Sequence, residues 1–218
     1  MAEAGIVLHD VEVPRTARVA VLGHPPGAET WLALHGYGQL AGRFLASFAG
    51  AERPGRAIVA PEALSRFYTS REPSRVGATW MTREARETEI TDYLRYLDLV
   101  VDRFAPPAGA IQVHGFSQGT ATATRWLEHT ARHVDRIVLW GGGIAPEVDL
   151  AAVRERRPGL EWHICIGDED EFITEEAVAA ESSRLEEAGI AFMLHRHPGG
   201  HRIDPAMLTE LSAPVSGG

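Results

Sequence analysis

Residues 110–123 read AIQVHGFSQGTATA. The apolar residues that open this stretch predict a buried strand over Ala110–His114, and the small residues that close it lead into a predicted helix over Gln118–His129. Between them lies Gly115-Phe116-Ser117-Gln118-Gly119, which fits the pattern G-x-S-x-G. A side chain on either glycine would collide with a neighbouring strand or helix, so the pattern predicts a tight turn. Ser117 is therefore a candidate nucleophile at a helix N-terminus, where backbone N–H groups favour negative charge.

Strands and helices alternate along the rest of the chain. The expected strands are Ile6–Val13, Arg18–Leu22, Thr30–Leu34, Ala57–Ala60, Ala110–His114, Arg136–Trp140, Leu160–Ile166 and Ile190–Arg196. The expected helices are Leu40–Gly50, Glu84–Phe104, Gln118–His129, Leu150–Arg156, Thr174–Ala188 and a last one from Asp204-Pro205. The first two strands are expected to form an antiparallel hairpin. The alternation predicts an α/β fold, a mostly parallel sheet with helices on both faces, in one domain over residues 1–218.

The composition is typical of a globular protein, with 44% hydrophobic and 23% charged residues among 218. A formal net charge of −9 disfavours a broad nucleic-acid-binding surface. A single cysteine, Cys165, excludes an intrachain disulfide and a Cys-rich metal site. Residues 1–10 do not resemble a signal peptide, and no run of about 20 apolar residues predicts a membrane span. We therefore expect a cytoplasmic protein with no nucleic-acid partner.

A second glycine-containing turn, His35-Gly36-Tyr37-Gly38, follows the expected strand Thr30–Leu34. The two glycines let the backbone approach a substrate carbonyl, so we expect the N–H of Tyr37 to donate to a developing oxyanion. The N–H of Gln118, next to the candidate nucleophile, would be the second donor. A turn that merely ends a strand is the alternative. The position of this turn one strand–helix–strand unit before Ser117 favours the donor interpretation.

A serine nucleophile needs a general base, and the base needs an orienting carboxylate. The expected strand that ends at Ile166 leads into Gly167-Asp168-Glu169-Asp170-Glu171. We expect Asp170 to be the carboxylate, because the third residue after a strand-terminal glycine turns back toward the edge of the sheet. Asp168 is the second candidate.

Among ten histidines, His201 is the expected base, because it lies on the loop between the last strand and the last helix. His195 and His197 lie on or beside that strand and are expected to pack or to face solvent. Together with His201 they could suggest a metal site, but no further ligands at matching spacing accompany them. His35 and His114 adjoin the two glycine turns, and we expect structural hydrogen bonds from them. The order Ser117, Asp170, His201 is the chain order of a nucleophile-elbow hydrolase.

With these residues assembled, the sequence resembles the phospholipase/carboxylesterase family of small α/β-hydrolases, which includes the acyl-protein thioesterases. The resemblance covers nearly the whole chain. It rests on Leu34-His35-Gly36-Tyr37-Gly38, Pro61-Glu62-Ala63, Gly115-Phe116-Ser117-Gln118-Gly119, Trp140-Gly141-Gly142-Gly143, Gly167-Asp168-Glu169-Asp170 and Gly200-His201.

The resemblance implies an α/β-hydrolase fold without a large cap domain. It also implies a cytosolic serine esterase that needs no cofactor or metal and acts on carboxylic ester or thioester substrates. Transferred residue by residue, it makes Ser117, Asp170 and His201 the triad and Tyr37 and Gln118 the oxyanion donors. A catalytically silent scaffold that binds a small ligand is the alternative. The sequence leaves open whether the protein is a homodimer.

The segment 64–82 departs from the family pattern, so the substrate is less defined than the chemistry. Four large apolar side chains here are candidates to line an acyl pocket, with core packing as an equal alternative: Phe67, Tyr68, Trp80 and Met81. Four arginines, counting the one that directly follows the segment, either bind an anionic leaving group or, as we favour, are solvated charges: Arg66, Arg71, Arg75 and Arg83.

Overall fold

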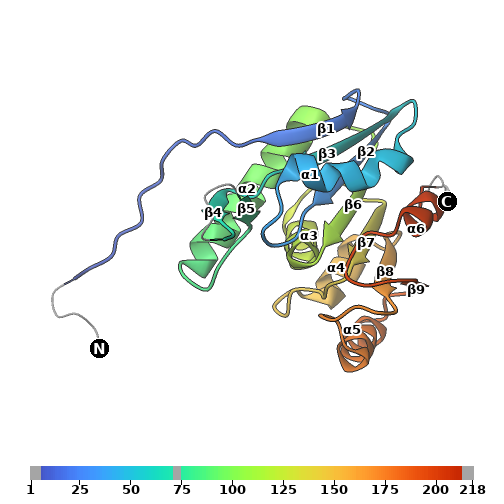
Figure 1. The fold of residues 1–218 in the computed structure, drawn as a ribbon. Helices are drawn as coiled ribbons and strands as arrows, with labels where there is room; N and C mark the ends of the chain where they lie inside the picture. Colours follow the sequence, from blue (N-terminus) through green and yellow to red (C-terminus); the bar gives the residue numbers. More distant parts are fainter. Residues whose placement is uncertain (1–5, 71–74, 213–218) are drawn as a thin grey trace.

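The fold is built on a seven-stranded sheet in the order β1-β3-β2-β6-β7-β8-β9 (Figure 1). The computed structural model describes residues 6–70 and 75–212. The sheet strands are β1 (Val19–Gly23), β2 (Glu29–Leu34), β3 (Arg56–Pro61), β6 (Ala110–Phe116), β7 (Arg136–Trp140), β8 (Glu161–Gly167) and β9 (Phe192–His197). β1 runs antiparallel to β3, and every other pair is parallel. The prediction of a mostly parallel α/β sheet is confirmed.

Helices cover both faces of this sheet (Figure 1). One face packs against α2 (Arg86–Phe104), α3 (Gln118–His129), α4 (Leu150–Arg156) and α5 (Glu175–Glu187). The other packs against α1 (Ala41–Leu45), the 3₁₀ helix η1 (Ala46–Ala51) and α6 (Pro205–Glu210). In β2, Leu32 and Leu34 enter the first core while Trp31 and Ala33 enter the second, because alternate side chains point to opposite faces. Within the described ranges, no helix is long and apolar enough to cross a membrane.

The expected strand over Ile6–Val13 is wrong. Residues 6–17 form neither helix nor strand, and Leu8 is 84% exposed. Figure 1 shows this segment extending beyond the sheet, and its Asp10 and Glu12 side chains accept hydrogen bonds from Thr88 and Arg95 of α2. The partner of β1 is β3 and not the preceding residues. The β-branched residues here favour an extended chain, but no neighbouring strand in the described structure supplies the pairing that would make it a strand.

Two further expectations are refined. The helix expected over Leu40–Gly50 is divided into α1 and η1. The connection over residues 61–82 contains a hairpin of β4 (Ser65–Tyr68) and β5 (Val76–Thr79), which pair antiparallel outside the main sheet.

A polar layer lies on the face of the sheet that carries α6. Arg136 on β7 pairs with Glu161 on β8 at 2.6 Å and donates to the Leu211 carbonyl at the end of α6. Beside this pair, His163 Nδ1 lies 2.9 Å from His195 Nε2, and the two rings stack. Burial, together with the positive charge of Arg136 and the neighbouring His195, lowers the pKa of His163 to about 4.

This pKa predicts a loss of stability in mild acid. A histidine whose folded-state pKa is lowered stabilises the fold above its ordinary pKa of 6.5, and that contribution is lost as the pH falls toward about 4. Between pH 7 and pH 5 we expect the unfolding free energy of the wild type to fall by roughly 2 kcal/mol more than that of His163→Gln. Urea denaturation at several pH values measures both. The prediction would be contradicted if the unfolding free energies of the wild type and of His163→Gln fell by the same amount between pH 7 and pH 5.

Candidate active site

Ser117 occupies the turn between β6 and α3. Its backbone has φ +52° and ψ −118°, a strained conformation for a residue other than glycine. The Ser117 N–H donates to the Trp140 carbonyl on β7 at 2.9 Å, which ties the turn to the next strand. A Cβ on Gly119 would overlap the Leu34 carbonyl of β2, and one on Gly115 would meet the Gly119 carbonyl at 2.5 Å. Both glycines are therefore required for the close packing of this turn.

Asp170 and His201 meet at the same edge of the sheet. Asp170 follows β8, His201 follows β9, and His201 Nδ1 lies 2.8 Å from Asp170 Oδ2. The other carboxylate oxygen accepts hydrogen bonds from the Phe172 N–H at 2.9 Å and the Ile173 N–H at 3.2 Å. The Asp170 side chain is 1% exposed and that of His201 17%. Asp168 is exposed, so of the two candidate acids it is Asp170 that reaches the imidazole.

Ser117 and His201 line one cavity of about 590 Å³. Gly141, which follows β7, also lines it. A Cβ on Gly141 would lie 2.9 Å from His201 Nδ1 and 3.2 Å from Asp170 Oδ2, so the absence of a side chain here leaves room for the pair. The loops after β6, β7, β8 and β9 thus converge because the carboxyl ends of parallel strands share an edge.

The loop with the expected donor Tyr37 borders the same cavity through Gly36 and Tyr37. His35 anchors this loop from inside the fold. Its Nε2 accepts a hydrogen bond from the Ala63 N–H at 3.0 Å, so its Nδ1 carries the proton and donates to the Gly36 carbonyl at 2.8 Å. Burial lowers the pKa of His35, which keeps this neutral tautomer. The contacts of His35 agree with the structural role expected from the sequence.

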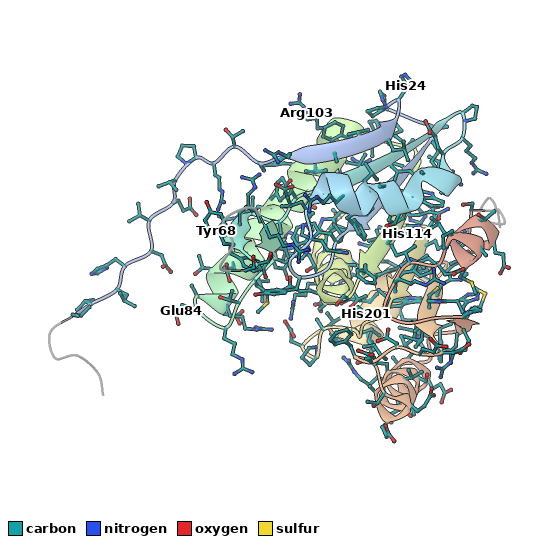
Figure 2. All side chains as sticks on the ribbon, viewed as in Figure 1. His24, Tyr68, Glu84, Arg103, His114 and His201 are labelled. Carbon is teal, nitrogen blue, oxygen red and sulfur yellow. The ribbon has the colours of Figure 1, made fainter. Side chains whose placement is uncertain are left out.

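His114 lies in the core, whereas His201 lines the cavity (both are labelled in Figure 2). His114 is fully buried on β6, where its ring stacks on Trp31. Burial lowers the pKa of His114 well below its ordinary value, so this histidine stays neutral. His195 is held by His163, and His197 is buried beside Trp140. Across residues 6–70 and 75–212, no group of three or more His, Cys, Asp or Glu side chains is arranged to hold a metal.

The four side chains of segment 64–82 that were candidates for an acyl pocket or for the core lie away from this cavity. Trp80 is buried in the core and donates from Nε1 to the His35 carbonyl at 2.8 Å. Met81 is half-buried and contacts Arg125 through its sulfur. Phe67 packs against the Tyr37 ring, and Tyr68 is 66% exposed. None of the four lines the cavity that contains Ser117.

Apolar side chains from other parts of the chain line the cavity instead. They are Phe44, Phe116, Phe172, Ile173 and Ile203. Phe172 is 72% exposed, and its ring centroid lies 4.8 Å from that of His201. The sequence held one signal for Phe172, its position two residues after the expected catalytic Asp170. Of the four arginines, Arg66 pairs with Glu62 at 2.7 Å, and Arg71 lies outside the described residues.

Solved structures share this architecture over almost its full extent. Esterase PE8 is 20% identical, with a TM-score of 0.67 over 91% of this chain and 97% of that one. The chain has the α/β-hydrolase fold. The same fold occurs in acyl-protein thioesterase 2 of Zea mays, which is 17% identical with a TM-score of 0.68 over 90% of this chain and 96% of that one. The carboxylesterase of Bacillus cereus is 14% identical, with a TM-score of 0.64 over 90% and 92%.

No protein-family model and no curated protein sequence matches this chain. The expected α/β-hydrolase fold is therefore confirmed by three-dimensional similarity at low sequence identity.

The packing of the Ser117 turn predicts the effect of two glycine substitutions. Gly119→Ala should lower the unfolding free energy by about 3 kcal/mol, because its methyl group would push α3 away from β2. Gly42→Ala is the matched control. Gly42 lies in α1 with open space around it, and alanine there should stabilise the fold by about 0.5–1 kcal/mol. Urea unfolding compares the two variants, and equal effects would contradict the packing argument.

Proposed function

We propose that this protein is a serine hydrolase that cleaves carboxylic ester or thioester bonds through an acyl-enzyme intermediate. The observation that carries the proposal is the 2.8 Å contact between the buried Asp170 carboxylate and His201, at the cavity that also contains Ser117. The esterase, carboxylesterase and thioesterase among the structures of the same fold support this reaction class.

The proton positions follow from the Asp170–His201 contact. Because Asp170 Oδ2 accepts from Nδ1, the neutral His201 imidazole has a free lone pair on Nε2. In the proposed reaction Nε2 takes the Ser117 hydroxyl proton as Oγ forms a bond to the acyl carbon and the carbonyl electron pair moves onto oxygen. When the tetrahedral intermediate collapses, the leaving alcohol or thiol takes the proton from Nε2. In the second half of the reaction, Nε2 takes a proton from water as the water oxygen forms a bond to the acyl carbon. The bond from Oγ to the acyl carbon then breaks, Oγ takes the proton back from Nε2, and the carboxylic acid is released.

The proposed oxyanion donors are the backbone N–H groups of Tyr37 and Gln118. By comparison with known oxyanion holes, each donor contributes about 3 kcal/mol or more to transition-state stabilisation. The cavity volume of about 590 Å³ suits a small-molecule substrate, and its apolar wall suits the acyl chain. We therefore propose apolar acyl esters or thioesters as the substrate class.

The role of the Ser117–His201–Asp170 set is tested with p-nitrophenyl butyrate. Ser117→Ala should abolish hydrolysis and labelling by a fluorophosphonate probe. Asp170→Asn should lower kcat by about 10⁴-fold, because an amide favours the wrong imidazole tautomer. Asp168→Asn, a change to the exposed neighbouring acid, is the matched control and should retain wild-type kcat.

A wild-type protein that hydrolyses none of the acetate, butyrate, octanoate and palmitate esters and escapes the probe would overturn the proposed function. The catalytically silent scaffold would then be the better interpretation.

The cavity wall predicts which aromatic side chain contributes to substrate preference. Phe172→Ala should lower kcat/KM for p-nitrophenyl octanoate roughly tenfold, because the acyl chain loses apolar contact surface, and should affect the acetate ester less. Tyr68→Ala removes an exposed aromatic ring that does not line this cavity, and it should leave kcat/KM for both esters at the wild-type value. A larger effect at Tyr68 than at Phe172 would favour the alternative in which side chains of segment 64–82 line the acyl pocket.

A further inference from the structure

The β4–β5 hairpin contacts both segments that supply the proposed oxyanion donors. On one side, its strand β5 binds the loop that carries Tyr37. The Gly38 N–H donates to the Ala78 carbonyl at 2.9 Å, and the Ala78 N–H donates to the Gln39 carbonyl at 3.1 Å. Within the loop, the Gly36 N–H donates to Gln39 Oε1 at 2.8 Å. The backbone on both sides of Tyr37 is therefore held in place, and part of that support comes from β5.

On the other side, the side chain of Gln118 holds the end of the same hairpin. Its Oε1 accepts a hydrogen bond from the Trp80 N–H at 3.1 Å. Its Nε2 donates to the Met81 carbonyl at 2.9 Å and to Thr79 Oγ1 at 3.0 Å. The amide presents its acceptor to a backbone donor and its donors to a backbone carbonyl and a hydroxyl, so only one orientation satisfies it.

These contacts give Gln118 two separable parts. Its backbone N–H is the proposed oxyanion donor, and its side chain faces the hairpin, which in turn binds the loop of Tyr37. The side chain is half-buried and does not line the cavity, so no part of it faces the substrate. Its polar atoms are committed to residues 79–81.

We propose that Gln118 is a positioning residue. Its side chain, through the β4–β5 hairpin, holds the two oxyanion donors in fixed positions relative to each other. The inference rests on the proposed function and adds a residue whose side chain acts through others. Because an oxyanion forms only in the transition state, misplaced donors lower kcat and leave substrate binding largely unchanged.

The experiment compares Gln118→Met with Thr124→Val on p-nitrophenyl butyrate. Gln118→Met keeps the length of the side chain and the backbone N–H but removes the hydrogen bonds to the hairpin. Thr124→Val removes a buried hydroxyl on the same helix, which bonds to the Ala121 carbonyl and the Ala145 N–H away from the hairpin. Melting temperature, kcat, KM and the inhibition constant of butylboronic acid, a tetrahedral adduct former, are measured for each.

We expect Gln118→Met to lower kcat roughly 10- to 100-fold with KM within about twofold of wild type. Affinity for the boronic acid should fall by a similar factor. Thr124→Val should lower the melting temperature but retain wild-type kcat, which separates positioning from general stability.

Gln118→Glu provides a pH signature. An ionised carboxylate would face the Met81 carbonyl without a proton to donate, whereas the protonated acid reproduces the two backbone contacts of the amide, with the Trp80 N–H and the Met81 carbonyl. The ratio of its kcat to that of wild type should therefore rise as the pH falls from 8 to 5. A structural role alone would leave the ratio flat, and a flat ratio overturns the inference.

The outcomes separate this inference from the function on which it rests. Active wild type, inactive Ser117→Ala and wild-type kcat in Gln118→Met would overturn the positioning role and leave the proposed function standing. A kcat loss shared equally by Thr124→Val would also overturn it. Wild-type protein inactive on esters would overturn both.

Discussion

The site depends on one strained turn. Ser117 has a positive φ, a conformation that costs on the order of 1–3 kcal/mol for a residue with a side chain. The surrounding packing maintains it, because Gly119 lets α3 lie against the Leu34 carbonyl and the Ser117 N–H is bonded to Trp140 on the next strand. The same packing that stabilises the turn therefore directs the serine toward the open edge of the sheet. A larger residue at Gly119 would separate these elements.

Parallel topology brings the remaining groups to that edge. The loops after β7, β8 and β9 contribute Gly141, Asp170 and His201, which are far apart in sequence and adjacent in space. The carboxylate of Asp170 is fully committed, with two backbone N–H groups on one oxygen and the imidazole on the other. These hydrogen bonds hold the carboxylate in one position, and the carboxylate in turn orients the ring that it contacts.

Elements outside the central sheet complete the site in two ways. The β4–β5 hairpin binds the loop of Tyr37 and, through residues 79–81, the side chain of Gln118. Trp80, which follows β5 and suited either an acyl pocket or the core, lies in the core and donates to the His35 carbonyl. The apolar cavity wall comes from loops, from helix α1 and from the end of β6, with Phe172 on the turn after Asp170, Phe44 on α1 and Phe116 on β6. The segments that support the Tyr37 loop are therefore different from the segments that form the apolar wall of the cavity.

The sequence by itself determined the α/β fold, the strand–turn–helix at Ser117 and the choice of Asp170 and His201 as candidates, because local patterns and chain order encode each of these. It failed for Ile6–Val13, where β-branched residues favour extension but strand formation depends on a partner elsewhere in the chain. It also could not separate core from cavity for Trp80 and Met81, since an apolar side chain suits either environment. Only the tertiary structure decided that Phe172 faces the cavity and that the Gln118 side chain binds the hairpin, because both depend on which loops meet at the edge of the sheet.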